Sequence, residues 1–308
     1  MFITVQDFTG VYAEQPFMQE LREKSAKSAD IHWLDCTKIV GTDCYCDDDA
    51  VKAINEMIDN SESGSKTECS GIIENRDNSM CSNSSANDVA EQPAIHFFDN
   101  GNYHYMSKLW TDRIQQPFSL IVFDHHPDMQ PPRFGGILSC GGWVLEVLEN
   151  NTFIQDVVII GVADHLADEI REELTQTGNA QVLNKITFVK ESELSSIGLD
   201  SSASPQNDDG NRIHLTSHTT HSTPIYLSID KDALAPAFAA TNWDQGSLNV
   251  ESLKKIITEL AANHKILGID ICGERAHDFE GDENHTIQKA DSLNNSLNRE
   301  LVDFLQNL

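Results

Sequence analysis

The chain has 308 residues, with 49 acidic side chains against 21 Lys and Arg, and its formal net charge at pH 7 is −28. This length is sufficient for one large α/β domain with a sizeable core. Such a negative charge argues against nucleic acid or an anionic membrane as the main partner, because binding either requires a surface of Lys and Arg. It favours a small cationic ligand.

The N-terminal residues, the apolar runs and the cysteines together indicate the cellular compartment. No apolar run in the sequence approaches the roughly 18 residues that a membrane span needs, and residues 1–7 lack the basic and apolar regions of a signal peptide. The seven cysteines are an odd number, which is typical of reduced thiols inside the cell. The sequence therefore predicts a cytoplasmic protein.

Eight short apolar runs rich in β-forming residues predict strands at 2–8, 31–36, 94–99, 120–124, 157–162, 186–189, 225–229 and 266–271. Most of these runs are continuous rather than alternating, as in strands that are covered on both faces. Apolar residues at helical spacing predict helices at 49–58, 142–149, 166–175, 250–263 and 292–308. Strands that alternate with helices predict an α/β fold with a mostly parallel sheet of about eight strands.

Two polar stretches interrupt this pattern. Residues 60–92 are rich in Ser, Asn, Asp and Glu, and residues 200–223 are rich in Ser, Asn, Thr and His. Neither stretch carries enough apolar surface to order itself well. Because strands continue on both sides of each, we expect insertions or mobile loops within a single domain that spans residues 1–308.

Carboxylates and imidazoles follow two predicted strands where those strands end. Asp124, His126 and Asp128 follow the strand at 120–124, and Asp230 and Asp232 follow the strand at 225–229. In an extended segment residues i and i+2 point to the same side, so each pair at that spacing shares a side. Pro127 bends the chain and allows Asp128 to return. Ligands of open parallel sheets bind beyond the carboxyl ends of the strands, where these side chains are expected to meet.

Each motif also has an ordinary structural explanation when it is taken alone. Asp124 to Asp128 could be a turn with a capping Asp, Asp230 and Asp232 could be solvated loop acids, and His104 could be structural. Together they form a carboxylate-rich set with two imidazoles, which suits Mn²⁺, Fe²⁺ or Mg²⁺ better than a thiolate-bound zinc. Such a set is large enough for two ions about 3.5–4 Å apart that share a bridging water.

At these residues the chain resembles the arginase/agmatinase/formiminoglutamase (ureohydrolase) family. That family carries Asp-Ala-His-x-Asp, here Asp124-His125-His126-Pro127-Asp128, and Ser-x-Asp-x-Asp, here Ser228-Ile229-Asp230-Lys231-Asp232. A Gly-Gly-Asp-His motif is matched loosely by Gly101-Asn102-Tyr103-His104. The resemblance spans roughly residues 94–275 and implies a three-layer α/β/α sandwich.

The resemblance also implies a site and a reaction. Two Mn²⁺ ions would be bound, with Fe²⁺, Ni²⁺ and Zn²⁺ as alternatives, and a metal-bound hydroxide would attack an amidine or guanidinium carbon and break a C–N bond. Asp128 would accept a hydrogen bond from that hydroxide. Family members are often trimers or hexamers, which implies a homo-oligomer. The implied ligands are His104 and Asp128 for one ion, His126 and Asp232 for the other, and Asp124 and Asp230 as bridges.

The substrate-binding part of the family pattern is altered. Gly273 stands where the family has its guanidinium-binding Glu, with Glu274 one place later, and no His occurs in 139–143, where many members have a proton-shuttle His. Glu274 or Asp164 could bind a cationic substrate instead. His125 or His165 could transfer protons, since a His with an ordinary pKa suits that task.

We therefore expect a metal-dependent hydrolase that cleaves a C–N bond of a small amidine- or guanidine-like compound. Two alternatives stay open. One is a metallohydrolase of the same fold that acts on another amide-type bond, and the other is a metal-binding but inactive regulatory member.

Overall fold

The structure is a computed structural model that describes residues 1–67, 93–132, 135–196, 223–280 and 286–308. The strands of its main sheet are β1 (Ile3–Asp7), β2 (Ile31–Asp35), β4 (Ala94–Phe97), β5 (Phe118–Phe123), β7 (Ile154–Val162), β8 (Ile186–Lys190), β9 (Ile225–Asp230) and β10 (Ile266–Cys272). They form one eight-stranded sheet in the order β2-β1-β4-β10-β9-β5-β7-β8, and every pairing in it is parallel. A separate antiparallel ribbon joins β3 (Tyr45–Cys46) and β6 (Leu138–Ser139).

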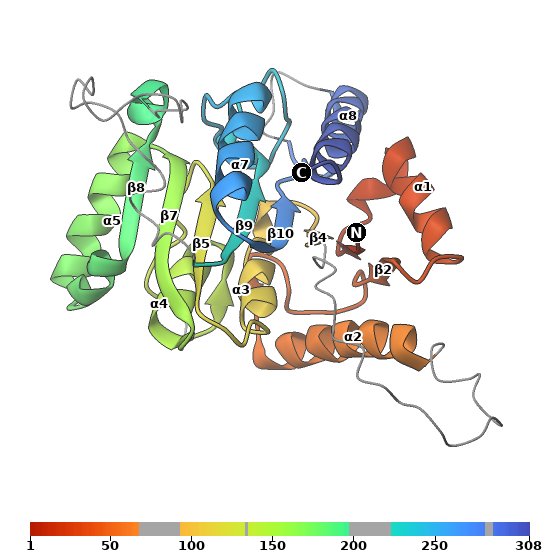
Figure 1. Cartoon of the computed structure of the whole chain (residues 1–308), viewed down its shortest axis with the longest axis horizontal. Helices are drawn as coiled ribbons and strands as arrows, with labels where there is room; N and C mark the ends of the chain where they lie inside the picture. The colour runs from red at the N-terminus through yellow and green to blue at the C-terminus, as the bar shows by residue number, and fades with distance from the viewer. Residues whose placement is uncertain (68–92, 133–134, 197–222, 281–285) are drawn as a thin grey trace, which may run out of the picture.

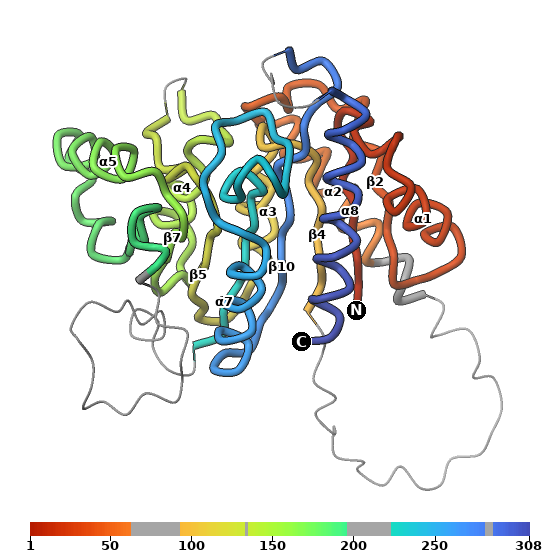
Figure 2. The backbone as a smooth tube through the Cα atoms, turned by 90° about the horizontal axis from the view of Figure 1, so that it is seen from above, coloured from red at the N-terminus to blue at the C-terminus, as the bar shows by residue number. Residues whose placement is uncertain are grey.

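Helices cover both faces of the sheet (Figures 1 and 2). One face carries α1 (Pro16–Ser25), α7 (Val250–Asn263) and α8 (Ile287–Leu305). The other carries α2 (Asp48–Thr67), α3 (Met106–Thr111), α4 (Trp143–Asn150) and α5 (Asp164–Gln176). The buried apolar residues accordingly form two clusters, one on each side of the sheet. This arrangement is the expected three-layer α/β/α sandwich.

Strand β5 explains why the apolar runs are continuous. All six of its residues are buried. Ile121 and Phe123 belong to the cluster beneath α7 and α8, whereas Leu120 and Val122 belong to the cluster beneath α3 and α4. Successive strand residues point to opposite faces, so a strand covered on both sides needs an apolar residue at every position.

The eight predicted strands are all confirmed, but some smaller elements were not predicted. Helix α1 buries only Phe17, Met18 and Leu21, and α3 has only six residues, so neither offers a long periodic pattern. Helix α2 continues to Thr67, past the point at which the first polar stretch was expected to leave the helix. The rest of that stretch, 68–92, and residues 200–222 of the second lie outside the described residues.

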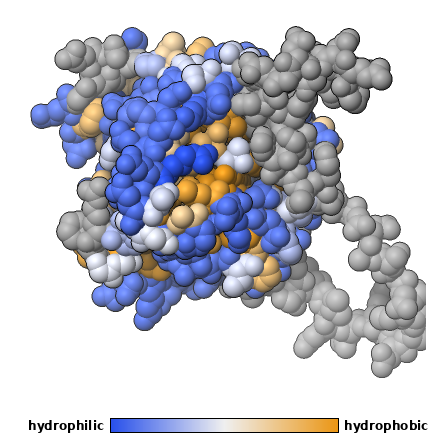
Figure 3. Space-filling view, turned by 90° about the vertical axis from the view of Figure 1, so that its left-hand side faces the viewer, coloured by the Kyte–Doolittle hydropathy of each residue, from blue (hydrophilic) through white to orange (hydrophobic). Residues whose placement is uncertain are grey.

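The surface agrees with the composition. Seen from the edge of the sheet that carries α5 and β8, the described surface is largely hydrophilic around a central hydrophobic area (Figure 3). In the part of the chain that the structure describes, none of the helices has the length and apolar character needed to cross a membrane.

Candidate metal centre

The candidate centre lies at the carboxyl ends of neighbouring strands. Asp124 directly follows β5, and Asp230 is the last residue of β9, which pairs with β5 along its length. His104 follows a short 3-10 turn, Gly101–Tyr103, after β4. Parallel strands end at the same edge of a sheet, so residues far apart in the sequence meet there.

The first group of donors surrounds His104. Its Nδ1 atom lies 3.2 Å from Asp124 Oδ2, 3.1 Å from Asp128 Oδ2 and 3.4 Å from Asp230 Oδ2. All four residues are buried. One imidazole nitrogen therefore faces three carboxylates in a space of the size that a metal ion occupies.

The second group contains His126. Its Nδ1 atom lies 3.0 Å from Asp232 Oδ2 and 3.6 Å from Asp124 Oδ1. Asp124 thus offers one oxygen to each group. The donor atoms of His104, Asp124 and Asp128 lie within 4.8 Å of one another, and so do those of Asp124, His126 and Asp232. The structure brings together all six residues that the sequence singled out as metal ligands.

Backbone amides fix the carboxylates. The amide of His126 donates to Asp124 Oδ1 at 2.6 Å, and the amide of Asp232 donates to Asp230 Oδ1 at 2.9 Å. The amide of His125 donates to Asp232 Oδ1 at 3.1 Å. These backbone hydrogen bonds orient the three carboxylates.

Two further side chains position ligands in ways that the sequence did not reveal. Trp143 is fully buried at the start of α4, and its Nε1 donates to Asp128 Oδ2 at 2.8 Å. Asp128 adopts a left-handed backbone conformation with φ 47, which turns its carboxylate back toward His104. Ser228 Oγ lies 2.8 Å from His104 Nε2 and so leaves Nδ1 to face the carboxylates.

The centre carries more buried negative charge than its two imidazoles can balance. Burial, together with the neighbouring Asp232, raises the pKa of Asp230 to about 7. Burial alone would lower the pKa of His126, but its hydrogen bonds to Asp124 and Asp232 raise it to about 12. Asp124 Oδ2 is buried and accepts no well-formed hydrogen bond from the part of the chain that the structure describes, although it lies 3.2 Å from His104. Such a site binds protons when no other cation is present, and its donors fit divalent metal ions.

A cavity of about 300 Å³ opens onto the centre. Trp243 forms part of its wall and is 43% exposed, and Cys44 and Cys140 lie at the wall near the ribbon. Two carboxylates four residues apart on α5 also line it; they follow β7, a position from which the sequence pattern could have indicated them. The lining carboxylates are those of Asp124, Asp128, Asp230, Asp232, Glu169 and Glu173.

Glu274 does not line this cavity. It is fully buried, and the cation that its carboxylate binds is the ammonium group of Lys231. Its oxygens also accept hydrogen bonds from Gln15 at 2.9 Å, Asn294 at 2.8 Å and Asn298 at 2.7 Å. The expected contact of Glu274 with a substrate is therefore at odds with its place in the fold, because its bonding capacity is used inside the protein.

Position 273, directly before Glu274, has no space for a side chain. Gly273 has φ 91, and a Cβ atom there would stand 2.3 Å from Asp230 Oδ1. The Glu of the family pattern could not be accommodated at this position in the present backbone.

Three other expected residues are outside the cavity lining that the structure describes. Asp164 begins α5, and its carboxylate accepts hydrogen bonds from the hydroxyl and amide of Ser192. His165 is exposed on the same helix, and His125 is half-buried, packed near Gly246. None of the three is among the described residues that line the cavity, so the structure does not support the substrate-binding and proton-transfer roles suggested for them.

Comparison with known proteins agrees with this geometry. The model of the arginase family matches residues 103–274, more than half of the chain. The chain belongs to the arginase family. An uncharacterized protein of Thermotoga maritima is 27% identical over 180 residues, and the match covers 58% of this chain and 58% of the length of that protein.

Solved structures share the fold of this arginase-family protein. Proclavaminate amidino hydrolase from Streptomyces clavuligerus superposes with a TM-score of 0.57 at 17% identity, covering 99% of this chain and 91% of the other. A triple mutant of the T. brucei arginase-like protein, bound with Mn²⁺, superposes with a TM-score of 0.54 at 16% identity, covering 99% and 91%. At these identities the likeness establishes the fold.

Proposed function

We propose that this protein is a hydrolase with two divalent metal ions that cleaves a C–N bond of a small amidine- or guanidine-like compound. The observation that carries the proposal is the pair of buried donor groups that share Asp124 at the floor of the cavity. Membership of the arginase family and the fold shared with an amidino hydrolase support the same reaction class.

In this proposal one ion would be held by His104 and Asp128 and the other by His126 and Asp232, with Asp124 and Asp230 as further ligands of the centre. When bound, two such ions supply an activated water and polarise the bond under attack. We favour Mn²⁺ for the ion at His126, because carboxylates dominate the donors of that group.

The chain's own groups would position the reactants. The carboxylate of Asp128 lines the cavity and is fixed through Oδ2 by Trp143, so it can hold a proton of the attacking water at a defined place. Ser228 and Ser107 hold the far side of the His104 ring through a chain of hydroxyl contacts of 2.8 Å and 3.0 Å. Neither task requires His125 or His165.

The charge of the cavity favours a cationic substrate. Two divalent cations would balance the four aspartates, and the carboxylates of Glu169 and Glu173 would remain negative. They stand one helical turn apart and face the same cavity from α5. We propose that they attract the charged end of the substrate in place of Glu274.

An amide-type substrate is the second candidate. Lys231 occupies the carboxylate of Glu274, and Gly273 leaves no group at the place of the family Glu. A substrate that carries no guanidinium group would need neither the carboxylate of Glu274 nor a Glu at position 273.

The test is a hydrolysis screen of the Mn²⁺-loaded protein across guanidino, ureido, formimino and simple amide compounds, read out as released urea, ammonia or amine. Turnover of an amidine or guanidine that is lost in Asp232→Asn would support the proposal. Turnover confined to amides would favour the second candidate. Metal binding without turnover across the panel would favour a regulatory role.

A further inference from the structure

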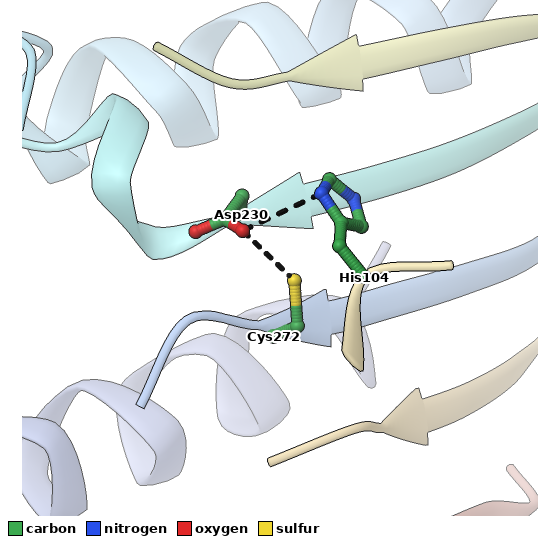
Figure 4. A group of neighbouring side chains, drawn as sticks. All are labelled: His104, Asp230 and Cys272. Carbon is green, nitrogen blue, oxygen red and sulfur yellow. Dashed lines mark hydrogen bonds and ion pairs between the residues drawn. The ribbon is translucent and has the colours of Figure 1, made fainter. Parts of the chain in front are cut away.

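A cysteine stands beside the candidate metal centre, outside the ligand set described above. Cys272 is the last residue of β10, and it pairs in register with Asp230, the last residue of β9. Side chains paired in this way on adjacent strands lie on the same face of the sheet. Figure 4 shows the sulfur of Cys272 and the ring of His104 both directed to the same oxygen of the Asp230 carboxylate.

The distances suit a shared metal ion. Cys272 Sγ lies 3.1 Å from Asp230 Oδ2, and the same oxygen lies 3.4 Å from His104 Nδ1. Donor atoms at bond lengths of about 2.0–2.3 Å around a tetrahedral ion are separated by about 3.3–3.8 Å. The observed spacing is therefore close to that of ligands around one ion, and small movements would complete it.

The three donors are buried together. Cys272 and His104 are each 1% exposed and Asp230 is 2% exposed, and their donor atoms all lie within 4.8 Å of one another. They come from β10, from the turn after β4 and from β9, so the sheet holds them in place. The thiol donates its hydrogen to Asp230, which places the sulfur beside the ligand cluster.

We propose that Cys272 is a thiolate ligand of the ion bound at His104, and that this ion is Zn²⁺ rather than Mn²⁺. On binding, the thiol proton passes to solvent and the sulfur bonds the metal. Thiolates favour zinc, whereas Mn²⁺ is bound mainly by carboxylates and water. The inference rests on the proposed binuclear centre and gives its two positions different metal preferences, since the candidate group of His126 adds two carboxylates and no thiol from the described residues.

Cys36 provides a matched control. It is also 1% exposed, but it belongs to none of the candidate metal groups among the described residues. Cys36→Ser should therefore test the loss of a buried thiol without a change at the metal centre.

The experiment uses Co²⁺ as a spectroscopic probe, because a cobalt–thiolate bond produces an intense charge-transfer band in the near ultraviolet. We expect this band in the wild-type protein and in Cys36→Ser, and its loss in Cys272→Ser. In competition between Zn²⁺ and Mn²⁺, Cys272→Ser should reduce the preference for zinc by at least about tenfold. Zinc-edge X-ray absorption of the wild-type protein should show a sulfur neighbour at about 2.3 Å, and this readout does not depend on a variant that folds.

The failures are distinguishable. Bound Co²⁺ without a charge-transfer band, or a zinc ion with only nitrogen and oxygen neighbours, would overturn the ligand role of Cys272 and leave the metal centre intact. Failure of the wild-type protein to bind Co²⁺ or Zn²⁺ would overturn both the inference and the proposed function.

Discussion

Two buried charged clusters share the short segment 230–232 at the end of β9. Asp230 and Asp232 point to the candidate metal centre, whereas Lys231 between them points to Glu274. The Lys231 cluster contains one ammonium group, one carboxylate and three side-chain amides that each donate a hydrogen bond to that carboxylate. The metal-centre cluster contains four carboxylates and two imidazoles.

The difference distinguishes a structural cluster from a binding site. A buried charge is costly unless it is paired. Glu274 has its counter-charge within the chain, so its cluster is complete without a ligand. The four aspartates of the metal centre face two imidazoles, and Asp124 Oδ2 is buried without a well-formed hydrogen bond among the described residues. Of the two clusters, the metal-centre cluster is the one whose buried negative charge requires bound cations.

The largest effect is expected from breaking the complete cluster. Lys231→Met leaves the carboxylate of Glu274 buried without its counter-charge, and we expect the free energy of unfolding to fall by about 3–5 kcal/mol. Urea denaturation of the metal-free protein measures this. The double variant Lys231→Met/Glu274→Gln should lose less than the sum of the two single changes, since the two residues are coupled. A change below about 0.5 kcal/mol in Lys231→Met would show that the pair is not a structural unit.

The next effect concerns the positioning of a ligand. Trp143→Phe keeps the packing of α4 but removes the hydrogen bond to Asp128. Loss of an outer partner of a metal ligand costs about 10–100-fold in metal affinity, and we expect a decrease in that range. Titration calorimetry with Mn²⁺ measures it, and Trp110→Phe, a buried tryptophan that bonds Gln6 instead, is the control. Equal affinities in the two variants would contradict the positioning role.

Metal binding at the candidate centre should also depend on pH. Metal-free His126 has its pKa raised to about 12 despite burial, so it carries a proton at neutral pH that metal binding must displace. Affinity for Mn²⁺ should therefore increase with pH, by about tenfold per unit for each proton released. Calorimetry in buffers of different ionisation enthalpy counts these protons. An affinity that is constant between about pH 6 and 8 would contradict the protonated state of the empty site.

The smallest effect is expected at the outer wall of the cavity. Glu169 is exposed, so its charge contributes only about 0.5–1 kcal/mol to attraction of a cation. For a cationic substrate Glu169→Gln should raise KM about two- to fivefold and leave kcat nearly unchanged. Glu172→Gln, on the same helix but outside the cavity lining, should change neither. Equal KM values in both variants would remove Glu169 from substrate attraction.

Much of the fold and the ligand set could be predicted from sequence for physical reasons. Strands covered on both faces need apolar residues throughout, so β5 and β9 were visible as continuous runs. The ligands follow those strands directly, at the edge where sites of parallel sheets form. Short elements such as α3 and the β3–β6 ribbon gave no comparable pattern.

The partners of charged residues could not be predicted in the same way. Glu274 looked available for a substrate because Lys231 is 43 residues away in the sequence and Gln15 is 259 residues away. Cys272 lies just beyond the predicted strand at 266–271, and only the pairing of β9 with β10 sets it beside Asp230. These roles depend on strand order and register, which local sequence does not encode.

The central claim is that the unbalanced cluster holds two divalent ions through Asp124. The most direct test is the metal content per chain of the purified protein after loading, compared between wild type, Asp124→Asn and Asp303→Asn, which alters an exposed carboxylate on α8. We predict two ions per chain in wild type and Asp303→Asn, and loss of bound metal in Asp124→Asn because both donor groups share that residue. Full metal content in Asp124→Asn, or none in wild type, would contradict the account.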